Sequence, residues 1–129
     1  MTFHLFDEPF YIVSSTHLER LPERVITNDM TNPANSYQLS VLEKFGVKPL
    51  MEMDAYTAAA QLALGGTGPA LIPLSIVKTL NIAPQHLFSF EELKNLIRPI
   101  HICVRPNSYQ SPRVKALIES IVDAVPKGV

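Results

Sequence analysis

The order of predicted elements between Val25 and Pro73 constrains the fold more than any other feature of the sequence. Apolar and β-branched residues predict strands at 24–28, 47–54 and 69–73, and the segments between them, 32–45 and 54–64, have helical spacing and composition. Strands joined in this order by helices are connected by right-handed crossovers and lie parallel. We therefore expect an α/β fold with an open, largely parallel sheet flanked by helices.

Three glycines, Gly65, Gly66 and Gly68, follow the second of these helices. A phosphate-binding loop places its glycines after a strand, so that the N–H groups at the start of the next helix point at the anion. Here the glycines follow the carboxyl end of a helix, which is its negative pole. We interpret them as positive-φ residues that turn the chain from helix to strand.

The flanking segments extend the predicted fold at both ends. Strands are predicted at 8–15 and 98–105, helical turns at 75–80 and 91–96 with a loop at 83–90 between them, and a helix at 111–125. Ser111 and Pro112 suit the start of the last helix, and we expect its apolar stripe to be buried. The stripe consists of Val114, Leu117, Ile118, Ile121, Val122 and Val125. With no repeat or linker visible, we expect a single domain over residues 1–129.

Composition excludes several classes of function. With 11 Lys plus Arg against 12 Asp plus Glu, the net charge is −1, so we expect no direct nucleic-acid binding. The one cysteine, Cys103, excludes a disulfide framework, and its apolar neighbours predict a small buried hydrophobe. We see neither a basic leader nor an apolar run of transmembrane length, and therefore expect a cytoplasmic protein without membrane contact.

Hydrogen-bonding side chains follow the predicted parallel strands at the edge where such sheets bind ligands. The rim contains no Lys or Arg, and its members are Thr31, Asn32, Asn35, Ser36, Tyr56, Thr57 and Ser75. Short polar residues such as these are typical of helix caps, so only their convergence points to a ligand. We expect Asn32 to cap the helix at 32–45, Asp54 or Thr57 the helix at 54–64, and Ser75 the turn at 75–80. Such a rim suits a small polar or carboxylate metabolite.

The residue types of an active site or a metal centre do not gather in the sequence. The four histidines have no metal-ligand spacing, and Cys103 alone does not complete a ligand set. The adjacent carboxylates Asp7 and Glu8 are typical of solvated residues, and no serine lies in a nucleophile elbow. We therefore predict no catalytic residue, no metal and no cofactor, and a small α/β enzyme is the weaker alternative.

Three stretches of the chain have a recognisable order and spacing: EPFYIVSS, MDAYTAAAQLALGGTGPALIPLSIV and RPIHICVRPNSYQSPRVKALIESI. Together they resemble the C-terminal part of the effector-binding, or regulatory, domain of LysR-type transcriptional regulators. In that family a helix ends at glycines and enters a strand that finishes in proline, here Gly66, Gly68 and Pro73. A later strand runs from an Arg-Pro pair to a basic residue, here Arg105, and precedes an amphipathic helix. Thr67 and Pro69 depart from the family pattern, which often has apolar or small residues there, and leave the turn geometry open.

The resemblance implies a type 2 periplasmic-binding-protein-like regulatory subdomain with a C-terminal strand and helix. It also implies that the chain is a fragment without the DNA-binding winged helix-turn-helix, so DNA contact would belong to the missing domain. The implied partners are a small-molecule inducer or co-inducer in a cleft between subdomains, with contacts from 31–36 and 56–57, and a second copy in a homo-oligomer, commonly a dimer. A free-standing solute-binding or interaction domain remains open beside this interpretation.

Overall fold

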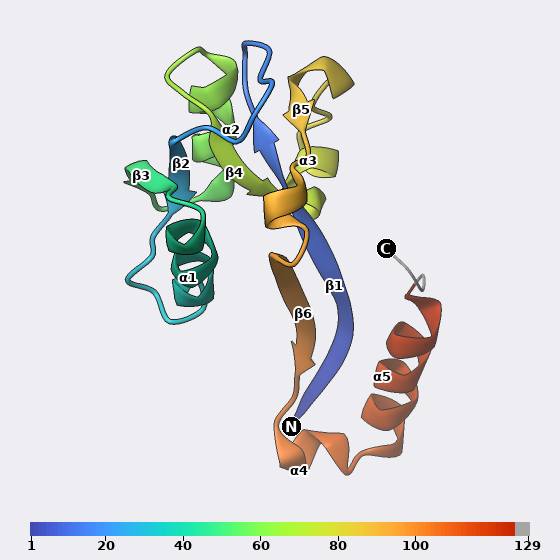
Figure 1. Ribbon diagram of the computed structural model, residues 1–129. Coiled ribbons are helices and arrows are strands. Elements are labelled where there is room, and N and C mark those ends of the chain that lie inside the picture. The colour runs from blue at the N-terminus through green and yellow to red at the C-terminus, as the bar shows by residue number, and fades with distance from the viewer. Residues whose placement is uncertain (126–129) are drawn as a thin grey trace. The chain divides into compact units, whose positions relative to one another are not determined.

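The computed structural model describes residues 1–125 and shows an α/β chain with six strands among them. Figure 1 shows the order of the elements along the chain. The strands are β1 (Thr2–Val13), β2 (Arg24–Asn28), β3 (Lys48–Met53), β4 (Ala70–Pro73), β5 (Leu87–Phe88) and β6 (Ile97–Cys103). The helices are α1 (Ser36–Lys44), α2 (Tyr56–Leu64), α3 (Leu74–Thr79), α4 (Pro106–Tyr109) and α5 (Pro112–Ala124), with short 3-10 turns η1 (Pro84–His86) and η2 (Glu91–Leu93).

The chain divides into two compact units. We call Pro9–Ile97 the sheet unit, and Met1–Glu8 together with Arg98–Val129 the ribbon unit. β1 contributes to both, because it begins at Thr2, six residues before the predicted start at Glu8.

The strands of the sheet unit follow the order β3-β2-β4-β1-β5. β2 lies parallel to both β3 and β4, as the strand and helix order predicts. β1 runs antiparallel to β4, with Phe10 opposite Pro73, and also antiparallel to β5. The sheet is therefore open and mixed, with its parallel part formed by β3, β2 and β4.

Small residues let α2 pack closely on the sheet. Ala59, Ala60 and Ala63 are fully buried, and α2 contacts β2 and β4. Fully buried Ile26 and Ile72 lie in the same core, where burial of each such side chain contributes about 1.5–3 kcal/mol. This packing fixes the start of α2 relative to the carboxyl end of β2.

The glycine cluster is a turn, and only part of it has the predicted backbone. Gly66 has φ +93°, whereas Gly65 ends α2 with φ −80°. The prediction of a positive φ was wrong for Gly65 and Gly68. Gly68 is required for a different reason, because a Cβ there would lie 2.6 Å from Cδ2 of Leu50.

Three helices of the sheet unit begin without the side-chain caps that the sequence suggests. Asn32 was expected to cap α1, but α1 begins after Asn35. α2 begins after Ala55 instead of at an Asp54 or Thr57 cap. α3 begins after Pro73, so Ser75 lies inside its first turn.

In the ribbon unit, β6 pairs with β1 and precedes α4 and α5. β6 alternates exposed and half-buried residues along its length, with Ile100 and Ile102 half-buried. The prediction of a buried thiol was wrong, because Cys103 is exposed on the opposite face. In α5 only Ile118 is buried, Val114 and Val125 are half-buried, and Leu117 is 61% exposed, so the predicted stripe is only partly covered.

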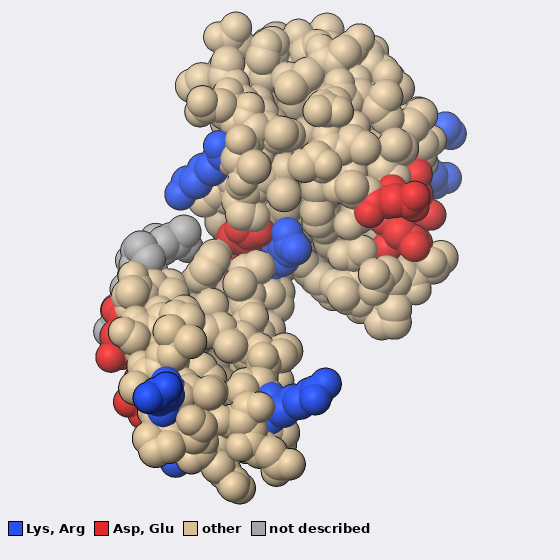
Figure 2. Space-filling model, turned by 180° about the vertical axis from the view of Figure 1, so that it is seen from behind, with Lys and Arg blue, Asp and Glu red and all other residues tan. Residues whose placement is uncertain are grey.

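The charges on the face shown in Figure 2 agree with a chain of nearly balanced composition. The Lys and Arg side chains described on that face stand singly or in small groups and form no continuous basic patch. Among the helices described, none has both the length and the apolar character needed to cross a bilayer.

Candidate functional site

The loop between β2 and α1 is built by hydrogen bonds around Asp29. One carboxylate oxygen, Oδ1, accepts hydrogen bonds from the Thr31 hydroxyl at 2.6 Å and the Thr31 N–H at 2.9 Å. The Thr31 hydroxyl, followed by the Thr31 N–H, lowers the pKa of Asp29 from its usual value near 3.8. Asp29 therefore remains ionised at neutral pH, and the loop carries a negative charge close to the predicted rim.

Further bonds within this loop occupy most of the predicted contact residues. Asn32 Oδ1 accepts a hydrogen bond from the Ala34 N–H at 3.0 Å, and the Ser36 hydroxyl donates to the Pro33 carbonyl at 3.1 Å. The Asn35 amide donates to the Asp29 carbonyl at 3.0 Å. These side chains shape the loop first, and any ligand would meet a rim that is already folded.

A buried polar contact joins the starts of α1 and α2. The Gln38 Nε2 amide donates to the Tyr56 hydroxyl at 2.8 Å, and this hydroxyl donates to Asn35 Oδ1 at 3.5 Å. Gln38 is fully buried, Tyr56 is 7% exposed, and the Tyr56 ring lies 6.3 Å from the ring of Phe10. We call Asn35, Gln38 and Tyr56 the polar junction.

Buried oxygens at this end of the sheet lack partners among the described residues. They are the Thr27 hydroxyl, Oδ1 of Asn28 and Oε1 of Gln38. Thr27 and Asn28 end β2, while Gln38 belongs to the polar junction. Buried polar atoms in proteins are usually hydrogen-bonded. Three buried oxygens without a partner among the described residues therefore distinguish this end of β2 as a polar region of the sheet unit.

The structure brings some of the predicted residues together and leaves others apart. Asn35 and Tyr56 meet in the polar junction, and Thr31, Asn32 and Ser36 lie in the adjoining loop. Thr57 is exposed on α2, next to Tyr56, while Ser75 lies in α3.

Sequence reasoning missed Gln38, Thr27 and Asn28. A signal for Gln38 was available, because it precedes the buried Leu42 by four residues and so shares its helix face. Nothing comparable marks Asn28, whose position follows only from the end of β2.

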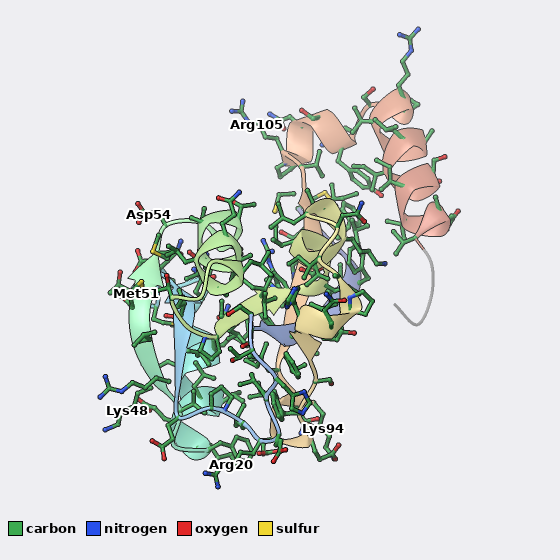
Figure 3. The ribbon with its side chains drawn as sticks, turned by 90° about the horizontal axis from the view of Figure 1, so that it is seen from above. Arg20, Lys48, Met51, Asp54, Lys94 and Arg105 are labelled. Atoms are coloured by element: carbon green, nitrogen blue, oxygen red, sulfur yellow. The ribbon has the colours of Figure 1, made fainter. Side chains whose placement is uncertain are left out.

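The basic side chains Arg20 and Lys48 lie away from the rim, and Lys48 begins β3 at the opposite end of the parallel strands. Figure 3 shows Arg20 and Lys48 away from Asp54, which follows the carboxyl end of β3. The rim thus offers hydroxyl, amide and backbone groups together with the Asp29 carboxylate.

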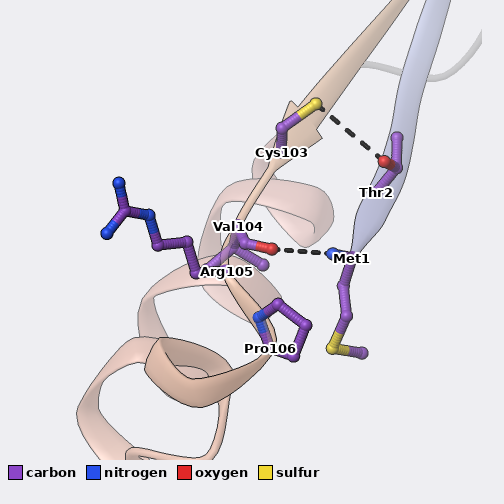
Figure 4. Close-up of a pocket in the computed structure, with 6 residues that line it drawn as sticks. All are labelled: Met1, Thr2, Cys103, Val104, Arg105 and Pro106. Atoms are coloured by element: carbon purple, nitrogen blue, oxygen red, sulfur yellow. Dashed lines mark hydrogen bonds between the residues drawn. The ribbon is translucent and has the colours of Figure 1, made fainter.

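Two hollows lie in the ribbon unit and are lined by residues outside the predicted set. Figure 4 shows the first, lined by Met1, Thr2, Cys103, Val104, Arg105 and Pro106. The second is lined by Phe3, Tyr109, Ile118, Glu119, Val122 and Asp123.

The adjacent carboxylates Asp7 and Glu8 lie in different surroundings, since Asp7 is partly exposed beside His4. Glu8 was expected to be solvated, but it is buried, with Oε1 3.5 Å from Nη1 of Arg98. In the described part of the chain, no three His, Cys, Asp or Glu side chains come together as a metal site.

Comparisons with known proteins place this geometry in context. Residues 2–126 match a family model described as the LysR substrate binding domain. The whole chain is 61% identical, over 129 residues, to an uncharacterized HTH-type transcriptional regulator of Vibrio cholerae serotype O1. The chain spans 45% of the length of that relative.

Solved structures share the fold at low sequence identity. CbnR, a LysR family transcriptional regulator, has a TM-score of 0.68 at 14% identity, over 98% of this chain and 48% of that chain. The CrgA regulatory domain from Neisseria meningitidis has a TM-score of 0.68 at 17% identity, over 98% of this chain and 69% of that chain. The matches confirm the predicted resemblance and the open α/β fold. They also confirm that the chain is no enzyme, because the matched family is one of transcriptional regulators.

Proposed function

Because the chain belongs to the LysR substrate-binding domain family, we propose that it is the small-molecule-sensing portion of a transcriptional regulator. The ligand binds at the carboxyl end of β2, in a cleft whose opposite wall comes from the part of the regulator outside this chain. The relative from Vibrio cholerae, of which the chain spans 45%, supports a longer protein of this kind.

The proposed site rests on the polar junction together with the buried oxygens beside it that have no hydrogen-bond partner among the described residues. Gln38 Nε2 donates a hydrogen bond to the Tyr56 hydroxyl at 2.8 Å. The buried Oε1 of Gln38 and Oδ1 of Asn28 accept no hydrogen bond from any described residue. Because these oxygens are buried, an ordered water can satisfy them and connect them to a polar molecule bound at this edge. The proposed ligand contacts are Thr31, Asn32, Asn35, Ser36, Tyr56 and Thr57.

Of the two ligand classes that suit the rim, we favour a neutral polar molecule over a carboxylate. No Lys or Arg lies among the proposed contacts, and the nearby Asp29 is held in its charged form. A carboxylate would be held by helix N-termini alone against that charge.

Nuclear magnetic resonance tests the site directly. We would titrate the chain with small polyols and primary amides, and with monocarboxylates of similar size, and follow the backbone amide signals. Shifts concentrated at 28–38 and 55–58, larger for the neutral compounds, are expected. Shifts spread over unrelated elements would refute the site.

Variants sharpen this test. Thr31→Val and Thr57→Val each remove one hydroxyl and should weaken binding about fivefold to tenfold, since one hydrogen bond contributes about 1 kcal/mol. Thr79→Val is the matched control, because its hydroxyl donates within α3 to the Ser75 carbonyl at 2.8 Å. Equal affinities for all three variants would count against the assignment.

The other partners follow from the same proposal. DNA is contacted by a domain outside this chain, and the regulator works in the cytoplasm as a homo-oligomer, commonly a dimer. The purified chain should therefore fail to retard duplex DNA at physiological salt, in agreement with its net charge of −1. Light scattering of the longer regulator measures its oligomeric state, and a monomer would contradict the proposed pairing.

A further inference from the structure

Backbone pairing in the ribbon unit places two histidines opposite each other. The amino group of Met1 donates to the Val104 carbonyl at 2.7 Å (Figure 4). The Val104 N–H donates back to the Met1 carbonyl at 2.8 Å. Hydrogen-bonded pairs in an antiparallel ladder alternate with pairs whose side chains lie closer together. Counting inward, Thr2 faces Cys103, with Oγ1 and Sγ 3.9 Å apart, and His4 faces His101.

The separation of the two imidazole rings matches joint coordination of one ion. The ring centroids of His4 and His101 lie 5.2 Å apart with 65° between the ring planes. A Zn–N bond of about 2.0–2.1 Å places the ion about 3.2 Å from each ring centroid. Two imidazoles at the tetrahedral angle then have centroids about 5.2 Å apart. The spacing of the two rings therefore permits joint coordination of one ion once the side chains rotate out of their T-shaped contact and turn one nitrogen of each ring toward it.

A neighbouring carboxylate orients the first ring. His4 Nε2 lies 2.8 Å from Asp7 Oδ1, and the two side chains are 50% and 43% exposed. A carboxylate that accepts the Nε2 proton leaves the lone pair on Nδ1, which is the nitrogen available to a metal. Metal-binding histidines commonly have such a carboxylate partner on their other nitrogen.

From these contacts we propose that His4 and His101 together bind one divalent transition-metal ion, with Asp7 as a positioning residue. The protein supplies two ligands, since no third His, Cys, Asp or Glu joins a cluster within the described residues. Water completes the coordination shell. Imidazole ligands favour Zn²⁺, Ni²⁺ and Cu²⁺ over Mg²⁺ and Ca²⁺, which prefer oxygen. This site lies in the ribbon unit and is independent of the ligand proposed for the sheet unit.

Calorimetric titration of the whole chain with ZnCl₂ and with NiCl₂ tests the proposal. One ion per chain is expected, with no competition from excess MgCl₂. His4→Gln and His101→Gln should each weaken binding at least tenfold, and Asp7→Asn about tenfold. His17→Gln is the matched control, because its ring also packs on another ring, that of Phe88 at 5.7 Å, and it should bind as the unmodified chain does.

Two further measurements separate coordination from ring packing. Cys103→Ser should leave the affinity unchanged, because the thiol is not a proposed ligand. Nitrogen-15 spectra of the ring nitrogens should show the Zn²⁺-induced shift on one nitrogen of His4 and one of His101. In Asp7→Asn the preference for the Nε2–H tautomer of His4 should weaken. Absence of saturable binding, or full affinity in the His4→Gln, His101→Gln double variant, would overturn the proposal, since T-shaped packing of aromatic rings alone also gives such spacing.

Discussion

Replacing Tyr56 by Phe should destabilise the chain more than replacing the glutamine that binds it. The substitution removes the hydroxyl that accepts from Gln38 Nε2 at 2.8 Å, and Oε1 of Gln38 has no other partner among the described residues. The whole amide of Gln38, which is 0% exposed, would then be buried without a hydrogen bond. A buried polar group left in this way costs about 1–3 kcal/mol, so we expect a loss of that size in the free energy of unfolding.

Gln38→Leu should relieve most of this cost. Alone, it removes one hydrogen bond worth about 1 kcal/mol and also removes a buried, unpartnered oxygen, so its net effect should stay below about 1 kcal/mol. In the double variant, apolar groups of similar shape replace both partners. The double variant should therefore be more stable than Tyr56→Phe alone.

Urea unfolding followed by far-ultraviolet circular dichroism measures all members of this cycle. Gln61→Leu is the matched control, because Gln61 is exposed on α2 and its replacement should change little in either background. The reasoning is refuted if the loss in the double variant equals the sum of the two single losses.

Other residues give expectations of the same kind. Gly66→Ala should cost about 1–2 kcal/mol of unfolding free energy in urea, because Gly66 has φ +93°; an unchanged midpoint would contradict this. Ile118→Asp should cost about 3 kcal/mol or more, whereas Leu117→Asp should cost below about 0.5 kcal/mol, since their exposures are 5% and 61%; equal losses would contradict the burial. Thr31→Val should raise the pKa of Asp29 toward 3.8 in an NMR titration. Because the pKa of Asp29 is lowered in the folded state, its ionisation stabilises the folded chain above pH 3.8, and this stabilisation is lost as the pH falls through the folded-state pKa. The pH-dependent stabilisation should therefore be smaller in Thr31→Val.

The parallel part of the sheet was predictable because local patterns and chirality determine it. Apolar runs gave β2, β3 and β4, helical spacing gave α1 and α2, and the right-handed crossover then leaves few arrangements. The direction of β1 was not predictable in this way, since it depends on pairing with β4 some 60 residues later, for example Val13 with Ala70. The first half of β1 was missed because its partner β6 is still more remote, with Met1 bonded to Val104.

The polar junction shows why the site was only partly predictable. Asn35 and Tyr56 could be placed at the rim from strand order, but Gln38 is a polar residue on a buried helix face and contradicts the usual apolar pattern. The predicted start of α1 was wrong because residue type alone does not distinguish a helix cap from a turn inside a loop. The Asn32 side chain accepts from the Ala34 N–H within the loop before α1 begins. The pairing of His4 with His101 was invisible in the sequence, because 97 positions separate two residues that only the ribbon brings together.

The charge balance at the rim connects the polar junction to the choice of ligand. A helix N-terminus favours an anion by about 0.3–1 kcal/mol at an exposed site. A carboxylate close to the same rim repels a second negative charge. Asp29, which the Thr31 hydroxyl and N–H keep ionised, therefore opposes what α1 and α2 offer to a carboxylate. Salt screens both of these charge interactions, so the affinity for a carboxylate should depend on ionic strength. Neither interaction acts on a neutral ligand, whose affinity should therefore be nearly independent of ionic strength. In Asp29→Asn the affinity for a carboxylate should rise several-fold while that for a neutral polyol stays constant, and equal changes for both ligands would show that Asp29 acts only through the loop's structure.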